Sequence, residues 1–386
     1  MRSAAGSLSD GLAALDRAAL RRRRRVLDSA QAVRVAIGGR EFANFSSNDY
    51  LGLAADPRLK AAAIDAITSW GVGAGASALV SGHMRIHDDA ERRFARFCGM
   101  QRALLFASGY AANLGVLAAF CDRESEIFAD RLDHACLVDG AILSRARLTR
   151  YRHLDLAALE ARLAASKASN KLVATDTVFS MDGDLAPVPA LLELCERHDA
   201  WLLLDDAHGV GVIGGGHGAL EHFGIRSDRI LYMATLGKAL GGYGAFVAAS
   251  PDAIDWLLQR ARTYIFSTAL PPMAAASAIA AMEIVDTEPG LIHALHHRIA
   301  HFRSRADAAR LPLLPSGTAI QPVVLGDSQR ALDASQALIG DGFFVPAIRP
   351  PTVPHGSARL RVSLCATHDL PQIDALVQAL SKAIGA

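Results

Sequence analysis

Short apolar runs alternate with amphipathic stretches through the middle of the chain, from about Asp56 to about Asp286. The apolar runs predict seven strands, namely RALLF, SEIFAD, RLTRYR, KLVATDTVF, WLLLDD, RILYMAT and YGAFVAAS. Helical stretches such as HACLVDGAILSRA and VPALLELCERHD separate most of them. Because apolar strands that alternate with helices form parallel sheets covered on both faces, we expect an α/β fold with a mostly parallel seven-stranded sheet. Such sheets bind ligands beyond the carboxyl ends of their strands.

The two ends of the chain show other patterns. Residues 1–55 are expected to form an arm, in which LSDGLAALDRAALRRRRRV has helical spacing with Ser9 or Asp10 as the N-cap. Within the same arm, VRVAIGGREFANF predicts a hairpin that turns at its paired glycines. Residues 56–286 are expected to form the large domain. Residues 287–386 contain AIQPVVLG, SQRALDASQALIGDG, ARLRVSL and LPQIDALVQALSKAIG, which predict a smaller α+β domain.

Composition excludes several classes of function. A net charge of +1 provides no general attraction for nucleic acid or for a membrane surface. The five cysteines are scattered and form no C-x-x-C, so we expect neither a disulfide framework nor a metal site, and a reducing cytoplasm fits. No signal peptide is evident at the N-terminus. The stretch MAAASAIAAMEIV is too short to cross a bilayer and predicts a buried helix.

Candidate chemistry gathers around two motifs. Asp205 ends the run WLLLDD, and His208 follows three residues later. Downstream, MATLGKALGGYGAFV places Lys238 among glycines and small apolar residues, where partial desolvation would lower the pKa of its amine and favour a nucleophile. Thr235 offers a hydroxyl for an anion. Together these residues suggest a pyridoxal phosphate site, with Lys238 as the Schiff-base amine, Asp205 on the pyridine nitrogen and His208 near the ring hydroxyl.

A second interpretation comes from the glycines. Gly209, Gly211 and Gly214 have the G-x-G-x-x-G spacing of nicotinamide dehydrogenases. In a dinucleotide fold, however, these glycines open a long helix directly after a strand, whereas GGGHGALEHFG follows here. The similar GVGAGA segment follows AIDAITSW, which is typical of a helix. The nicotinamide interpretation is therefore the weaker alternative.

Motifs along nearly the whole chain resemble the α-oxoamine synthase family, in the aspartate-aminotransferase-like (fold type I) group of pyridoxal phosphate enzymes. The resemblance rests on these segments: NFSSNDYLGL, GAGASALVSG, FASGYAANLG, DRLDHACLVDG, TDTVFSMDGDLAPV, DDAHGVGVIG, TLGKALGGYGAF, FSTALPP and IRPPTVPHGSARLRVSL. It implies a homodimer whose active sites are shared, with GAGASALVSG and FSTALPP contributed by the neighbouring chain.

The resemblance also implies roles for individual residues. Lys238, His134 and Asp205 would be catalytic, with His134 stacked on the cofactor ring. The cofactor would be bound by Gly109, Tyr110, Ser180, Asp205, His208, Thr235 and Lys238. In FASGYAANLG the pattern itself agrees, because a strand, a glycine turn and a helix start present amide groups that bind an anion.

Substrate would be bound by His134 and by arginines at both ends of the chain. Arg349, Thr352 and Arg361 match the family's C-terminal substrate segment, and a guanidinium fork suits a carboxylate. Arg359 would be structural. In the arm, Arg21 is the first choice and Arg22 the second, although a solvated helix C-terminus explains most of the run RRRRR.

Two segments, NFSSNDYLGL and IRPPTVP with ARLR, resemble the family members that join L-alanine to a pimeloyl thioester in biotin biosynthesis. The implied reaction is an acyl transfer with decarboxylation, from pimeloyl-CoA or pimeloyl-acyl carrier protein. One alternative is a glycine-using sister synthase, such as a 2-amino-3-ketobutyrate CoA ligase. Another is an inactive partner subunit, which would be expected to lack the lysine found at Lys238.

Overall fold

The structure is a computed structural model, and residues 4–385 of the chain are described. The chain forms two compact units: Asn48–Leu295, and a second unit that combines residues up to Ser47 with those from His296 onward. The division into domains at residues 55 and 286 stays a prediction. Residues 1–3 of the predicted arm and residue 386 of the predicted C-terminal domain lie outside the described residues. In the described part of the chain, no helix combines the length and the apolar character needed to cross a membrane.

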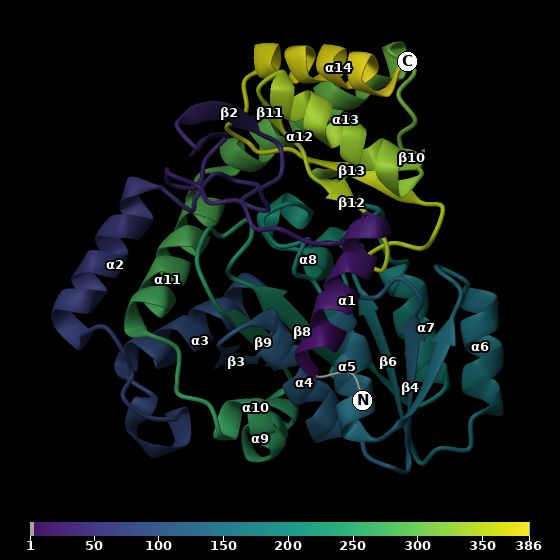
Figure 1. Cartoon of the computed structure of the whole chain (residues 1–386). Helices are drawn as coiled ribbons and strands as arrows, with labels where there is room; N and C mark the ends of the chain where they lie inside the picture. The colour runs from purple at the N-terminus through teal and green to yellow at the C-terminus, as the bar shows by residue number, and fades with distance from the viewer. Residues whose placement is uncertain (1–3, 386) are drawn as a thin grey trace. The chain divides into compact units, whose positions relative to one another are not determined.

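A seven-stranded sheet forms the centre of the Asn48–Leu295 unit, in the order β3-β9-β8-β7-β6-β4-β5 (Figure 1). Only β9 runs antiparallel to its neighbours, which confirms the predicted mostly parallel sheet. All seven predicted strands are present, as β3 (Arg102–Phe106), β4 (Ser125–Asp130), β5 (Arg147–Tyr151), β6 (Asn170–Asp176), β7 (Ala200–Asp205), β8 (Ile230–Thr235) and β9 (Ala245–Ala249).

Helices surround this sheet (Figure 1). They are α2 (Pro57–Trp70), α3 (Arg85–Phe97), α4 (Gly109–Phe120), α5 (Ala135–Ser144), α6 (Leu156–Ala165), α7 (Val188–Arg197), α8 (Ala219–Phe223), α9 (Pro251–Arg260), α10 (Arg262–Ile265) and α11 (Pro272–Thr287), with the single turns η1 (Ala78–Gly82) and η2 (Gly214–Gly216). Apolar side chains of the central strands pack with those of α4 and α9 in one buried cluster that includes Leu104, Val247, Val116 and Ile254. Burial on both faces explains why these strands are continuous apolar runs.

The other unit contains two small sheets, β1-β2-β11 and β10-β13-β12. The hairpin of β1 (Arg34–Ile37) and β2 (Arg40–Asn44) turns at two glycines with φ of 56° and 76°, as predicted. The expected strand, helix, strand, helix order is found in β10 (Ile320–Gly326), α13 (Ser328–Gly340), β13 (Ala358–Ser363) and α14 (Leu370–Ile384). The short strands β11 (Phe343–Phe344) and β12 (Ala347–Ile348) were not predicted, and α12 (Pro289–Ala308) runs from one unit into the other.

The first helix differs from the prediction at both ends. Helix α1 spans Ala4–Arg17, so Ser9 and Asp10 lie inside it and neither is its N-cap. Alanines at the start of the segment are strong helix formers, which extends the helix toward the N-terminus. Ala19 has a φ of 55°, and the amide of Leu20 donates to the carbonyl of Leu15 at 2.8 Å. The helix therefore ends before the arginine run, which is not a helix C-terminus.

The glycine-rich stretch after β7 forms tight turns instead of a dinucleotide-binding helix. A 3-10 turn at Gly214–Gly216 is followed only by the five-residue α8. Gly218 has a φ of 86°, and a Cβ there would run into the Asp206 carboxylate and the Tyr232 hydroxyl. The Asp206 carboxylate also accepts the amide of Ala219 at 2.8 Å. These glycines thus let the loop close on Asp206, and they carry no nucleotide motif.

Candidate active site

The carboxyl ends of β6, β7 and β8 bring most of the candidate residues of the Asn48–Leu295 unit together. Asp176 and Asp205 are register partners at the ends of β6 and β7, and Thr235 is the last residue of β8. The turns that follow β7 and β8 carry His208 and Lys238. This is the edge of a parallel sheet at which ligands bind.

Asp205 is a buried carboxylate with a defined orientation. It is 4% exposed, and its Oδ2 accepts a hydrogen bond from the Asn113 amide nitrogen at 2.7 Å. Its Oδ1 accepts the backbone amide of Ala207 at 3.0 Å. Asn113 was missed from the sequence, although it is a single amide side chain in the otherwise apolar helix α4. That isolation was the signal, because a buried polar side chain needs a partner.

His208 is held by a second residue that sequence reasoning missed. The chain turns directly after β7, and the buried Nδ1 of His208 lies 2.8 Å from the hydroxyl of Tyr50. Tyr50 itself is fully buried and comes from the NFSSNDYLGL segment. Whichever atom carries the proton, this bond fixes the plane of the imidazole.

The start of α4 forms a cradle with the end of β8. Ser108 caps the helix by accepting the amide of Ala111 at 3.2 Å, and Gly109 is the first helical residue. A Cβ on Gly109 would lie 2.6 Å from Thr235 Cγ2, so only glycine allows this approach. The first amides of a helix have no partner within the helix and attract anions. Tyr110 points its hydroxyl at Asp139, so its contribution here is its backbone.

His134 is the N-cap of α5 and lies within the electrostatic reach of Lys238 and Asp205. Its Nδ1 accepts the amide of Cys136 at 3.3 Å, so the neutral ring carries its proton on Nε2. Desolvation lowers the pKa of His134, Lys238 lowers it further, and Asp205 opposes both effects. Lys238 is partly buried in the turn after β8, as its context predicts. The ring of His134 is therefore a neutral hydrogen-bond donor at neutral pH.

Ser180 lies in a tight turn after β6 and is partly buried. The amide of Gly183 donates to the carbonyl of Phe179 at 2.8 Å, which closes that turn around it. Asp176, just before the turn, was not singled out from the sequence. Burial raises its pKa, and the neighbouring carboxylates Asp205 and Asp133 raise it further.

In the other unit, the candidate substrate residues form a cluster of their own. The Arg22 guanidinium donates to Thr352 Oγ1 at 3.2 Å. Burial lowers the pKa of Arg349, and the charge of Arg22 lowers it further. Arg21 instead pairs with Asp16 at 2.5 Å. Of the two arginines considered for the arm, the structure places Arg22, and not Arg21, beside Arg349 and Thr352.

The two arginines of β13 are both buried. Arg361 is 5% exposed and donates to Ser363 Oγ at 3.0 Å, whereas Arg359 is 4% exposed and donates to the carbonyl of Ser357 at 3.0 Å. Arg361 is therefore not a solvated surface charge. Burial alone does not separate it from Arg359, because residues two apart share one face of a strand.

The groups of the Asn48–Leu295 unit fit pyridoxal phosphate. A buried, anchored carboxylate at Asp205, an amine at Lys238 and a helix start opened by Gly109 are the groups that its pyridine nitrogen, aldehyde and phosphate require. Among the described residues, no group of histidine, cysteine and carboxylate side chains could hold a metal ion.

Comparisons with known proteins agree with this arrangement. The family model Aminotransferase class I and II matches residues 40–380. The 8-amino-7-oxononanoate synthase of Aromatoleum aromaticum is 53% identical over 376 residues, which cover 97% of each chain. Among solved structures, the serine palmitoyltransferase from S. paucimobilis, with a bound PLP-myriocin aldimine, has a TM-score of 0.92 at 28% identity and covers 98% of both chains.

A crystal structure of 8-amino-7-oxononanoate synthase from Francisella tularensis is also similar, with a TM-score of 0.78 and 29% identity. It covers 89% of this chain and 98% of its own. These likenesses agree with a fold type I architecture and with pyridoxal phosphate as cofactor, and they exclude the nicotinamide alternative. The chain belongs to the aminotransferase class I and II family, among its pyridoxal phosphate-dependent 8-amino-7-oxononanoate synthases.

Proposed function

We propose that this protein joins L-alanine to a pimeloyl thioester, releases carbon dioxide and the thiol carrier, and forms 8-amino-7-oxononanoate. The names of its relatives support this substrate pair. The observation that carries the proposal is the grouping of Asp205, Lys238 and His134 at the carboxyl edge of the sheet. A carboxylate, an amine and a neutral imidazole there supply an anchor, a base and a donor for this reaction.

The residues of this edge would hold the cofactor by its three polar parts. Lys238 would bind the aldehyde carbon through its amine, Asp205 would face the pyridine nitrogen, and His208 the ring hydroxyl. The phosphate would be held at the α4 N-terminus and nearby hydroxyls, by Gly109, Tyr110, Thr235 and Ser180. When bound, pyridoxal phosphate accepts the electron pair that remains on the alanine Cα after proton or carboxylate loss.

Each catalytic residue would act on a defined atom. The Lys238 amine would remove the proton from the alanine Cα and later return one to the product. Asp205 would keep the pyridine nitrogen protonated. Its buried carboxylate can do this without reorienting, because each of its oxygens already accepts a hydrogen bond. The Nε2–H of His134 would donate to the carbonyl oxygen of the thioester, since its Nδ1 already accepts a backbone amide.

Arginines would recognise the substrate carboxylates. Arg349, Thr352 and Arg361 remain our candidates for this role, and Arg22 joins them in place of Arg21 because it contacts Thr352. A planar guanidinium can bind a carboxylate through two parallel hydrogen bonds. Exchange of Arg22 for lysine should raise the KM of one substrate, whereas the same exchange at Arg21 should change it little.

The test is a product assay on purified protein with L-alanine and pimeloyl-CoA, followed by mass spectrometry. A product with the mass of 8-amino-7-oxononanoate supports the proposal. Parallel reactions with glycine and L-serine address the sister synthases, because a preference for either amino acid would overturn the alanine assignment. Pimeloyl-acyl carrier protein in place of pimeloyl-CoA identifies the acyl donor.

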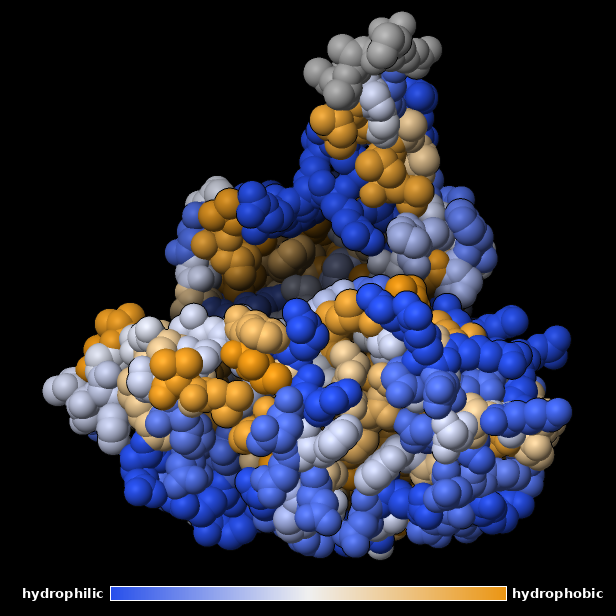
Figure 2. Space-filling view, turned by 90° about the horizontal axis from the view of Figure 1, so that it is seen from below, coloured by the Kyte–Doolittle hydropathy of each residue, from blue (hydrophilic) through white to orange (hydrophobic). Residues whose placement is uncertain are grey.

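We also propose a homodimer with shared active sites, in a reducing cytoplasm. The two segments expected from the neighbouring chain lie together, because Ser77 forms a β-bridge with Thr268 and the amide of Ala269 donates to Ala76 at 3.0 Å. Large apolar side chains nearby are exposed, such as Val80 at 79% and Phe266 at 69%. Groups of apolar residues also interrupt the polar face seen in Figure 2. A second copy of the chain would cover such surface.

Complementation tests the shared site. A Lys238→Ala chain is mixed with a Thr268→Trp chain, and native mass spectrometry confirms that heterodimers form. If sites are shared, a heterodimer collects both lesions in one site and leaves the other intact, so part of the activity returns. Heterodimers that stay inactive would show that each site belongs to one chain. The cytoplasmic setting is supported by the five cysteines, all of which are buried and none of which forms a disulfide.

A further inference from the structure

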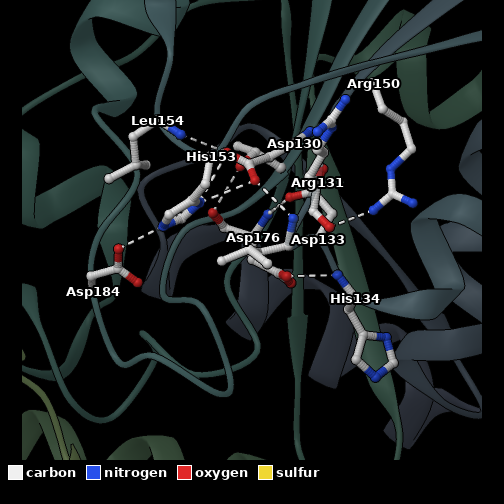
Figure 3. Close-up of polar contacts among 11 residues, drawn as sticks. Asp130, Arg131, Asp133, His134, Arg150, His153, Leu154, Asp176 and Asp184 are labelled. Atoms are coloured by element: carbon white, nitrogen blue, oxygen red, sulfur yellow. Dashed lines mark hydrogen bonds and ion pairs between the residues drawn. The ribbon is translucent and has the colours of Figure 1, made fainter. Parts of the chain in front are cut away.

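A network of buried carboxylates contacts the backbone of His134 (Figure 3). Its charged centre is His153, in the loop between β5 and α6. His153 Nδ1 lies 3.0 and 3.1 Å from the two carboxylate oxygens of Asp130, and its Nε2 lies 2.7 Å from Asp184 Oδ2. Since both ring nitrogens face carboxylates, both must donate, and the ring is an imidazolium.

The Asp130 carboxylate joins two loops. It ends β4 and accepts the amide of Leu132 at 2.8 Å, within the turn that leads to His134. It also accepts the amide of Leu154 at 2.9 Å, in the loop of His153. Both loops therefore depend on one carboxylate, which is 1% exposed.

From Asp130 the network continues to His134 through three hydrogen bonds, each donated by a backbone amide to a side-chain carboxylate (Figure 3). The amide of Asp130 donates to Asp133 Oδ2 at 2.7 Å, and the amide of Asp176 donates to Asp133 Oδ1 at 3.1 Å. The amide of His134 in turn donates to Asp176 Oδ2 at 2.8 Å. The Asp133 carboxylate therefore holds the backbone of Asp176, and the Asp176 carboxylate holds the backbone of His134.

The balance of charge explains why a cation is needed here. Burial raises the pKa of Asp133, and the Asp130 charge raises it further. At His153 burial disfavours the cation, but the hydrogen bonds that the ring donates to Asp130 and Asp184 outweigh this effect and raise the pKa to about 10. The ring of Phe179 meets the His153 ring edge-on, with the two centroids 4.4 Å apart.

We propose that His153, clamped between Asp130 and Asp184, is a positioning residue that fixes the 130–134 turn and thereby the ring of His134. It contacts neither substrate nor cofactor in this role. The importance of this position for turnover rests on the function proposed for His134, whereas the positioning itself does not. The experiment below separates the two.

The primary measurement is hydrogen exchange in a His153→Asn variant of the full-length protein. The amides of Leu132 and Leu154 should exchange at least about tenfold faster than in the wild type, because their acceptor Asp130 loses a fixed position. The amide of His134 should follow, because Asp133 and Asp176 link it to Asp130. His301→Asn is the matched control. His301 lies 2.9 Å from Asp374 Oδ1 with a side-chain exposure of 24%, close to the 25% of His153. Exchange at the three amides should not change in the control.

The outcomes discriminate clearly. Unchanged exchange at these amides in His153→Asn would overturn the proposal. Faster exchange together with a roughly tenfold lower kcat/KM supports both positioning and the role of His134. Faster exchange with wild-type kcat/KM supports positioning and argues against the catalytic role of His134. Should His153→Asn fail to fold, Asp184→Ala removes only the acceptor on the Nε2 side of the ring, and unchanged exchange at these amides in that variant would equally overturn the proposal.

The pH dependence of the same amides tests whether the His153 ring is an imidazolium. A histidine with its ordinary pKa of 6.5 would lose its charge, and the clamp with it, on passing pH 7. With a pKa near 10, the protection of the three amides should stay constant from pH 6 to about 8.5, after correction for intrinsic exchange. A loss of protection centred near pH 6.5 would contradict the imidazolium.

Discussion

Asn113 is the sharpest test of how the site anchors Asp205. Its amide nitrogen donates to Asp205 Oδ2 at 2.7 Å, and both residues are buried, at 0% and 4% exposure. Its own Oδ1 is buried and lacks a hydrogen-bond partner among the described residues. An Asn113→Leu substitution nearly keeps the shape of the side chain. It removes the donor to Asp205 and, at the same time, an unsatisfied acceptor.

The magnitude follows from these contacts. A hydrogen bond to a charged group is worth about 1.5–3 kcal/mol, so kcat/KM should fall by about 10- to 150-fold if Asp205 must be held in place. The melting temperature should change little, because the lost hydrogen bond is offset by removal of the unsatisfied oxygen. Steady-state kinetics with L-alanine and pimeloyl-CoA, together with thermal unfolding, measure both quantities.

Asn170→Leu is the matched control for this substitution. The Asn170 amide donates to the carbonyl of Phe120 and to Ser125 Oγ at 3.3 Å, at the amino end of β6 and away from Asp205. It should lower stability without a specific effect on kcat/KM. An Asn113→Leu enzyme with normal stability and a kcat/KM within twofold of the wild type would refute the proposed anchoring of Asp205.

Other substitutions test the remaining parts of the site. Lys238→Ala should lower kcat by at least roughly a thousandfold while circular dichroism shows an intact fold, and an active variant would rule out its role as amine and base. Asp205→Asn should slow exchange of the alanine α-proton by at least roughly a hundredfold and weaken cofactor binding less; wild-type exchange would contradict the assignment. Gly109→Ala places a Cβ 2.6 Å from Thr235 Cγ2 and should weaken pyridoxal phosphate binding about tenfold in equilibrium dialysis, whereas Gly340→Ala, in open space, should not.

Local pattern alone determined the order and type of most elements. The central strands of the main sheet, such as β7 and β9, are short apolar runs, because both faces of a mostly parallel sheet are covered, and this pattern is visible in the sequence. The hairpin that turns at two glycines and the order of elements in the C-terminal region could also be predicted from the sequence. Turns and amphipathic helices depend mainly on residues that are close along the chain. The lysine and aspartate motifs were recognised for the same reason.

Where the elements end, and which distant side chains meet, was decided by tertiary structure. The end of α1 before the arginine run depends on a left-handed residue at Ala19 that no residue preference announces. The partners Asn113 and Tyr50 come from segments far from Asp205 and His208 in sequence. The clamp of His153 joins three loops in the same way. Such contacts arise because buried polar groups must find partners in space, and a single sequence records the need for a partner but not its identity.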